Sequence, residues 1–91
     1  MKISKLNEFT ASVIKTHYNH FFEGLKIRLE DELCEEFDDA PLVSTLVILE
    51  EKSGLNRMQF TSQSADKVFE LVLENIHILN KEIKNFKKDL T

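Results

Sequence analysis

The clearest hydrophobic pattern lies in the last third of the chain. Apolar residues recur there at alternating spacings of four and three: Ala65, Phe69, Val72, Ile76, Leu79, Ile83, Phe86 and Leu90. This spacing gives a helix one continuous apolar face, the seam by which helices pair in a coiled coil. Because Ser64 is a suitable N-cap residue, the pattern predicts one helix over residues 64–90, about 40 Å long at about 1.5 Å per residue.

Two partners are possible for this seam. Its first half has further apolar residues on both sides and is expected to cover a core, whereas its second half is narrow. Glu82 falls at a g position and Lys87 at the following e position, which suits a bridge between two parallel helices. Packing on the N-terminal helix of the same chain is the alternative. We expect a homodimer interface made by Phe69, Val72, Ile76, Leu79, Ile83, Phe86 and Leu90.

A second helical pattern occupies the N-terminal segment. Apolar and aromatic residues recur there at spacings of three and four, which predicts a helix over residues 4–23. Ser4 suits an N-cap, and Gly24 suits a C-terminal stop. The residues assigned to the apolar face are Leu6, Phe9, Val13, Ile14, His17, Tyr18 and Phe21.

The middle of the chain fits either strands or helices. Residues 25–29 and 56–62 alternate apolar with polar side chains, and residues 42–49 are rich in β-branched side chains. Residues 50–56 would then form a hairpin loop around Gly54. In the helical alternative, Pro41 opens a helix that Gly54 ends. That alternative also places four residues in one helical row: Leu25, Leu29, Leu33 and Phe37.

We favour strands for this region, because two segments alternate and because Glu50 and Glu51 would otherwise lie in the last turn of a helix. The helix dipole favours cations at that end. The predicted fold class is therefore α+β, as a single domain over residues 1–91. It comprises an N-terminal helix, a small three-stranded antiparallel sheet and a long C-terminal helix, and an all-α helical bundle is the alternative.

Charge is distributed unevenly along the chain. Residues 30–51 hold nine acidic and no basic residues, while the segments before and after them have small positive balances, for a net charge of −4. Seven carboxylates fall within residues 30–39, and they are the predicted partner-binding residues: Glu30, Asp31, Glu32, Glu35, Glu36, Asp38 and Asp39. No glycine lies where a calcium loop needs one, so an ordinary solvated surface and a docking surface for a basic protein remain as interpretations.

The remaining composition indicates a cytoplasmic protein. The chain has a single cysteine, Cys34, so it cannot form an internal disulfide. Its longest apolar run is far shorter than a membrane span, and its first residues do not resemble a signal peptide. We therefore expect no membrane association, no cofactor and no nucleic-acid partner, the last because no basic excess is present.

Candidate chemistry is sparse. His17, His20 and Glu23 are spaced to share one helix face, as in a metal site, but surface or half-buried histidines are the simpler interpretation and we expect no bound metal. Cys34 is expected to be half-buried and inert, because neighbouring carboxylates disfavour an activated thiolate. No phosphate-binding loop or nucleophile motif is present. The sequence therefore predicts no catalytic residues and no enzyme activity.

One segment, residues 49–60, resembles the turn of a helix-turn-helix element. Gly54 would form the turn, and Arg57 would be the strong base-reading residue of the second helix. Glu50 falls where that motif usually has a small residue, and the segment is not basic. The expected function is therefore an acidic, homodimeric, protein-binding regulator, either an inhibitor or an adaptor, and a DNA-binding transcriptional regulator is the alternative.

Overall fold

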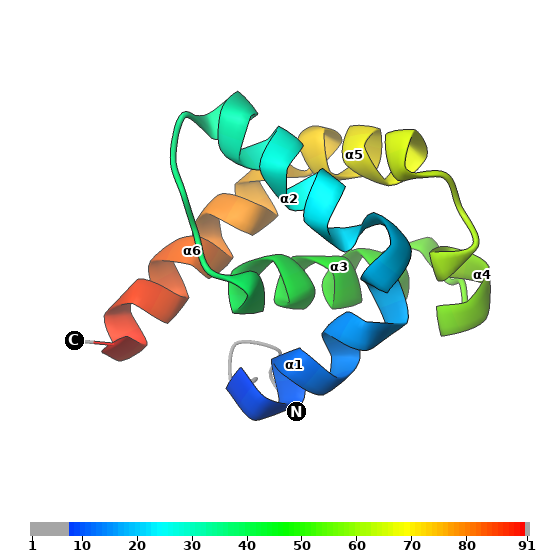
Figure 1. Cartoon of the computed structure of the whole chain (residues 1–91), viewed down its shortest axis with the longest axis horizontal. Helices are drawn as coiled ribbons and strands as arrows, with labels where there is room; N and C mark the ends of the chain where they lie inside the picture. Colours follow the sequence, from blue (N-terminus) through cyan, green and yellow to red (C-terminus); the bar gives the residue numbers. More distant parts are fainter. Residues whose placement is uncertain (1–7, 91) are drawn as a thin grey trace.

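Helix α3 (Asp39–Ser53) lies at the centre of an all-helical fold (Figure 1). This computed structural model describes residues 8–90, with the side chains of residues 9–18 and 21–87, and no strand occurs among them. The α+β prediction is therefore wrong, and the helical alternative is the correct one. The other helices are α1 (Glu8–Lys15), the 3₁₀ helix η2 (Thr16–Tyr18), α2 (Asn19–Leu33), α4 (Arg57–Thr61), α5 (Ala65–Glu74) and α6 (Ile76–Leu90).

The β-branched run was mistaken for a strand because α3 is covered on nearly every side. Helices α1, α5 and α6 all pack against it, so its buried residues do not form one stripe. Pro41 lies in the first turn, where the backbone N–H groups have no intrahelical partner. Gly54 ends the helix in the left-handed conformation, with φ 74°. The buried residues of α3 are Ala40, Pro41, Leu42, Val43, Ser44, Thr45, Leu46, Leu49 and Glu50.

The alternating residues 25–29 belong to α2. In a strand Ile27 would share the buried face with Leu25 and Leu29, but Ile27 is 60% exposed while the two leucines are buried. Leu25 and Leu29 are four residues apart and so lie on one helix face. Gly24 lies inside α2 rather than at a helix end. The predicted C-terminal stop at Gly24 is therefore wrong.

The predicted hairpin and third strand are replaced by a turn and the short helix α4. Asn56 caps this helix by accepting a 2.8 Å hydrogen bond from the Gln59 backbone N–H. The Gln59 side chain accepts in return from the Asn56 N–H at 3.0 Å, which completes a capping box. Phe60 is buried and Met58 is 80% exposed, so the two do not share a face as a strand would require.

The N-terminal pattern gives two helices joined by η2, not one. Ala11, Tyr18, Phe21 and Phe22 are buried, whereas Phe9 is 79% exposed and Val13 49% exposed. The buried face of α1 is therefore the one that carries Ala11, and the predicted face was partly wrong. Ser4 and Leu6 lie outside the described residues.

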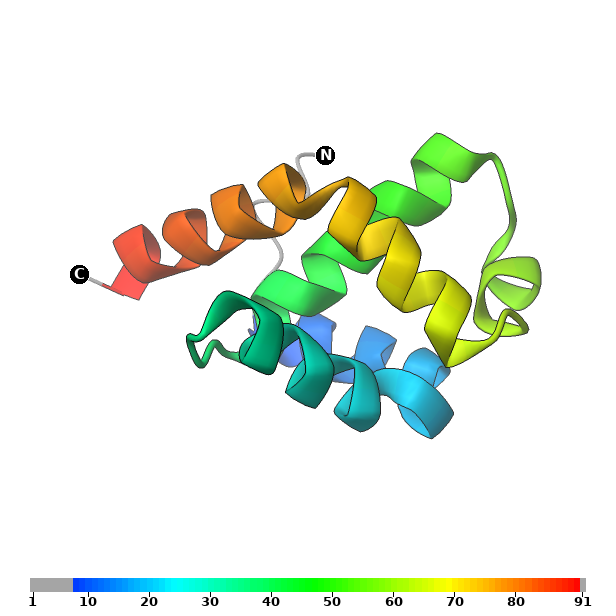
Figure 2. The ribbon, with the colours of Figure 1, turned by 90° about the horizontal axis from the view of Figure 1, so that it is seen from above.

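The predicted long C-terminal helix is interrupted at Asn75. Ser64 is the N-cap of α5, as predicted, and its hydroxyl accepts from the Lys67 N–H at 3.2 Å. Asn75 has φ −120° and ψ 32°, and α6 then turns away from α5 (Figure 2). Helix α5 packs mainly on α2, and α6 mainly on α3. Within residues 8–90 no helix is both long and apolar enough to span a membrane.

Candidate functional site

The acidic segment forms the connection between α2 and α3 and the two helix turns beside it (Figure 1). Helix α2 ends at Cys34, which adopts a left-handed conformation with φ 54°. The Cys34 N–H donates to the Asp31 carbonyl at 3.3 Å, and the Glu35 N–H donates to the Glu30 carbonyl at 3.1 Å. These two bonds make a Schellman motif, which satisfies the last carbonyls of the helix. The motif turns the chain so that the segment becomes an exposed corner.

Three of the seven predicted carboxylates are held by the protein itself. Glu30 accepts a 3.2 Å hydrogen bond from the Phe37 N–H and lies 3.7 Å from Lys26. Asp39 pairs with Lys15 at 2.8 Å. Glu35 pairs with Lys87 of α6 at 3.1 Å. These three acidic side chains therefore fasten the corner to α1, α2 and α6.

The pairing of Asp39 changes the ionisation of both partners. Burial opposes ionisation of Asp39, but the Lys15 hydrogen bond and the charges of Lys15 and Lys26 outweigh it, so the pKa of Asp39 is lowered. The hydrogen bonds of Lys15 to Asp39 and Glu23 raise the pKa of Lys15. Both groups are therefore charged at neutral pH.

The other four predicted carboxylates face solvent. Asp31, Glu32, Glu36 and Asp38 are exposed, and within the described residues no cation or hydrogen-bond donor contacts their side chains. A shallow hollow of about 480 Å³ lies beside two of them, Asp31 and Glu36, and the exposed Ile27 contributes to its lining. The hollow is lined by Ile27, Glu30, Asp31, Cys34, Glu35 and Glu36. We call Ile27, Asp31, Glu32, Glu36 and Asp38 the acidic corner.

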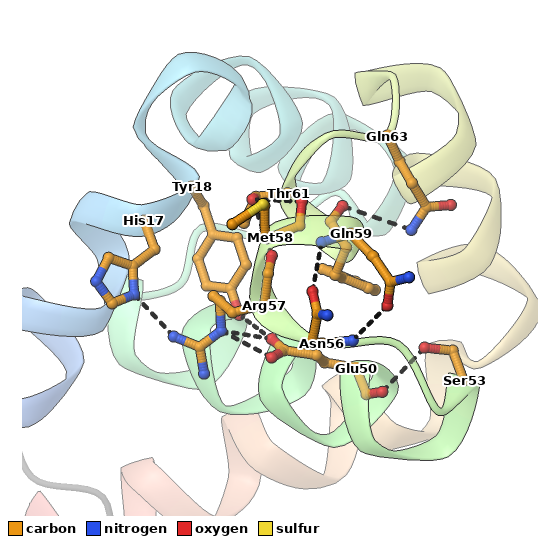
Figure 3. A network of polar contacts seen from close by, with 11 residues as sticks. His17, Tyr18, Glu50, Ser53, Asn56, Arg57, Met58, Gln59, Thr61 and Gln63 are labelled. Carbon is orange, nitrogen blue, oxygen red and sulfur yellow. Dashed lines mark hydrogen bonds and ion pairs between the residues drawn. The ribbon is translucent and has the colours of Figure 1, made fainter.

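A second polar cluster joins η2, α3 and α4 (Figure 3). The buried hydroxyl of Tyr18 donates to Glu50 Oε2 at 2.8 Å. Arg57 Nε donates to both carboxylate oxygens of Glu50, at 2.8 and 2.7 Å. Its Nη1 lies 2.8 Å from His17 Nδ1, which must accept because a guanidinium only donates. Glu50 lies near the C-terminal end of α3, where the helix dipole disfavours a carboxylate. The hydrogen bonds from Tyr18 and Arg57 offset this unfavourable interaction.

This cluster was not predicted from the sequence, although the sequence contains a signal for it. Glu50 lies four residues after Leu46 and eight after Leu42, which places it on a buried row of α3. A carboxylate on a core row requires partners from other elements. Glu50 binds Tyr18 of η2 and Arg57 of α4, so it holds the turn after α3 in place.

The described residues of the candidate metal site have other partners. His17 faces Arg57 and Glu23 pairs with Lys15 at 3.1 Å, while the His20 side chain lies outside the described residues. Among the side chains that the structure describes, no three acidic, histidine or cysteine residues gather as metal ligands would. Cys34 is exposed rather than half-buried.

The segment that resembled a helix-turn-helix does contain two helices and a turn. Its second helix, α4, has only five residues, too few to lie along a DNA groove as a recognition helix does. Arg57, its predicted base reader, is bound to Glu50.

The seam residues are mostly covered by their own chain. Val72, Leu79 and Ile83 are buried in the core, and Phe69, Ile76 and Phe86 are partly buried against it. Glu82 and Lys87 have partners in their own chain: Glu82 accepts from Ser44 at 2.6 Å, and Lys87 pairs with Glu35. The Leu90 side chain lies outside the described residues.

The chain was compared with known protein families, with curated proteins and with solved structures, and none of them matches it.

Proposed function

We propose that this chain is a non-enzymatic regulator, an inhibitor or adaptor, that binds a basic protein segment through the acidic corner. The observation that carries the proposal is the division among the seven carboxylates. Three hold the fold together, whereas no cation among the described residues contacts the other four, and two of these, Asp31 and Glu36, line a hollow with the exposed Ile27. Carboxylates without a partner among the described residues remain available for one on another protein.

The composition of the acidic corner indicates what the partner segment presents. Asp31, Glu32, Glu36 and Asp38 favour lysine or arginine side chains, and their summed field would accelerate the encounter. Ile27 favours an apolar side chain between the basic ones. A basic amphipathic helix or loop of another protein satisfies both requirements. A cytoplasmic location suits this role, because the only cysteine is a free exposed thiol.

The test measures binding of short Lys/Arg-rich helical peptides that carry one central leucine, by fluorescence anisotropy at low and high salt. The wild-type chain is expected to bind, more weakly at high salt. The variant Asp31→Asn/Glu32→Gln/Glu36→Gln should bind about tenfold more weakly, because each exposed ion pair contributes about 0.2–1 kcal/mol.

A control variant removes the same charge elsewhere. Glu51, Glu70 and Glu74 are exposed, and Glu51→Gln/Glu70→Gln/Glu74→Gln should keep wild-type affinity. If both variants bind the peptide equally weakly, only net charge matters. If neither variant changes the affinity, the peptide binds elsewhere on the chain. Either result contradicts the proposal. Duplex DNA, titrated in parallel at low salt, tests the alternative function.

A further inference from the structure

The apolar seam of the C-terminal region continues without interruption through a break in the helix. Val72, Ile76 and Leu79 keep the spacing of four and three across Asn75, yet α5 ends at Glu74 and α6 begins at Ile76. An unbroken heptad pattern is typical of one straight helix. The sequence pattern and the bent structure therefore describe two different arrangements of the same segment.

The break is small in conformational terms. The Asn75 N–H still donates to the Leu71 carbonyl at 3.2 Å, as in a helix, and its side-chain amide donates to the same carbonyl at 2.9 Å. Asn75 has φ −120° and ψ 32°, whereas a helical residue has a φ of about −63° and a ψ of about −42°. Rotation at this one residue would join α5 and α6 into a single helix.

Helix α6 is attached to the rest of its own chain mainly through one neighbour. It packs on α3 (Figure 2), its Leu79 and Ile83 are buried in the core, and its Lys87 reaches Glu35 of the acidic connection. The α3–α6 contact also includes Glu82, which is 4% exposed and accepts from Ser44 and from Asn85 at 3.3 Å. No cation contacts Glu82 within the described residues, and burying a carboxylate in this way weakens an interface. Helix α6 is therefore an element that separates from α3 more readily than an entirely apolar helix would.

We propose that α6 exchanges between two copies of this chain, with Asn75 as the hinge. In the exchanged dimer α5, Asn75 and α6 form one helix over residues 65–90, and each α6 occupies the place on α3 of the other copy. All α3–α6 contacts are remade between chains, as in other domain swaps. The straight helices gain a new mutual contact along the continuous seam at Ile76, and a one-residue hinge favours such exchange. This inference does not rest on the proposed function.

Two substitutions at the hinge shift the equilibrium in opposite directions. Asn75→Ala favours the straight helix and Asn75→Gly disfavours it. The equilibrium constant for straightening should differ by about fivefold between the two variants at each hinge. Because the dimer contains two hinges, its dissociation constant should differ by about 30-fold between the variants. Light scattering coupled to size exclusion over a range of protein concentrations measures this difference. If Asn75→Ala is monomeric at every concentration, or if the two variants dimerise equally, the proposal is overturned.

A cross-linking experiment separates exchange from side-by-side pairing. In a Cys34→Ser background, chains carrying Glu35→Cys are mixed with chains carrying Lys87→Cys, unfolded, refolded together and treated with a short bis-maleimide. Both positions are exposed, so neither substitution disturbs the core, and a chain carrying both cysteines serves as the intrachain control. Exchange predicts a cross-linked heterodimer from the mixture.

Lys52→Cys mixed with Lys87→Cys is the matched negative control. Lys52 is exposed in the last turn of α3, whereas Lys87 and Pro41, from the first turn of α3, line one hollow, so the exchanged dimer keeps Lys52 and Lys87 apart. A dimer from the Glu35→Cys and Lys87→Cys mixture that does not cross-link between chains overturns the exchange. Equal cross-linking from the Lys52→Cys mixture would show random collision and also overturns it.

Discussion

The hydroxyl of Tyr18 donates a 2.8 Å hydrogen bond to the carboxylate of Glu50, although the two residues lie 32 positions apart in the chain. The Tyr18 side chain is completely buried, and its ring meets that of Phe60 edge-on, with the centroids 6.2 Å apart. Burial, reinforced by the bond to Glu50, raises the pKa of Tyr18 well above its ordinary value, against the opposing charge of Arg57.

Stability should therefore decline at alkaline pH. In the unfolded chain Tyr18 ionises near pH 10, while in the folded chain it keeps its proton to higher pH. The folded state thus binds more protons above about pH 10, so the free energy of unfolding falls as pH rises past that value. The chain has one tyrosine, so tyrosinate absorbance reports this residue alone. We expect the absorbance to rise at higher pH in the folded protein than in denaturant.

The variant Tyr18→Phe isolates the hydroxyl. It should lose about 1–2 kcal/mol at neutral pH, because the Glu50 carboxylate loses a buried donor. Its stability should fall less steeply above pH 10 than that of the wild-type chain. Coincident tyrosinate titrations in the folded and denatured wild-type protein would contradict this assignment.

Cys34→Gly should stabilise the protein. Cys34 is the only non-glycine residue with positive φ among those that the structure describes, and a side chain in the left-handed region costs about 1–2 kcal/mol. Glycine removes this cost, but its greater freedom in the unfolded chain offsets part of the gain in stability. We therefore expect the free energy of unfolding, measured in urea, to increase by about 0.5–1 kcal/mol. Cys34→Ala is the control for loss of the thiol and should change stability little, and Cys34→Val should destabilise the chain. An equal response of Gly and Ala would show that the left-handed conformation is not what matters.

The position of Ile27 shows why the fold class could not be obtained from alternation alone. Leu25, Ile27 and Leu29 alternate as in a strand, yet two of them lie on the helix row that packs inward and the third faces solvent. Five residues span little more than one helical turn, so such a short stretch satisfies both periods. The uniform apolar run of α3 is ambiguous for a related reason, because a helix covered on all sides has no stripe.

Leu29→Ala and Ile27→Ala form a matched pair on α2. Leu29 is fully buried, and its truncation should cost about 2–5 kcal/mol in the free energy of unfolding. Ile27 is 60% exposed, so its truncation should change stability by about 0.5 kcal/mol or less. Chemical denaturation at neutral pH measures both. Similar losses from the two variants would favour the strand that the sequence suggested.

The acidic corner was only partly predictable. The sequence identifies all seven carboxylates as one charged segment. Glu35 differs from its neighbour Glu36 because it pairs with Lys87, which is 52 positions away from Glu35 in the chain. The pairing of Asp39 likewise depends on Lys15, 24 positions earlier. Local patterns contain no information on which distant lysines approach the segment, so the free and the engaged acids could not be distinguished.

Ser44 and Glu82 should be energetically coupled across the α3–α6 contact. Ser44→Ala removes a donor from a buried carboxylate and should cost about 1–3 kcal/mol. Thr45→Val is the matched control on the same helix, because the equally buried Thr45 hydroxyl bonds to the Pro41 carbonyl of its own helix, and it should cost less.

Replacing both partners tests the coupling directly. Ser44→Ala/Glu82→Met removes the buried charge together with its donor, and apolar side chains of similar volume are tolerated in such a place. The double variant should therefore be more stable than Ser44→Ala alone, with a coupling energy of about 0.5–3 kcal/mol in a double-mutant cycle of urea unfolding. Strict additivity of the two single changes would mean that Glu82 does not depend on Ser44. The carboxylate would then be solvated and α6 would lie less closely against α3 than the 2.6 Å bond requires.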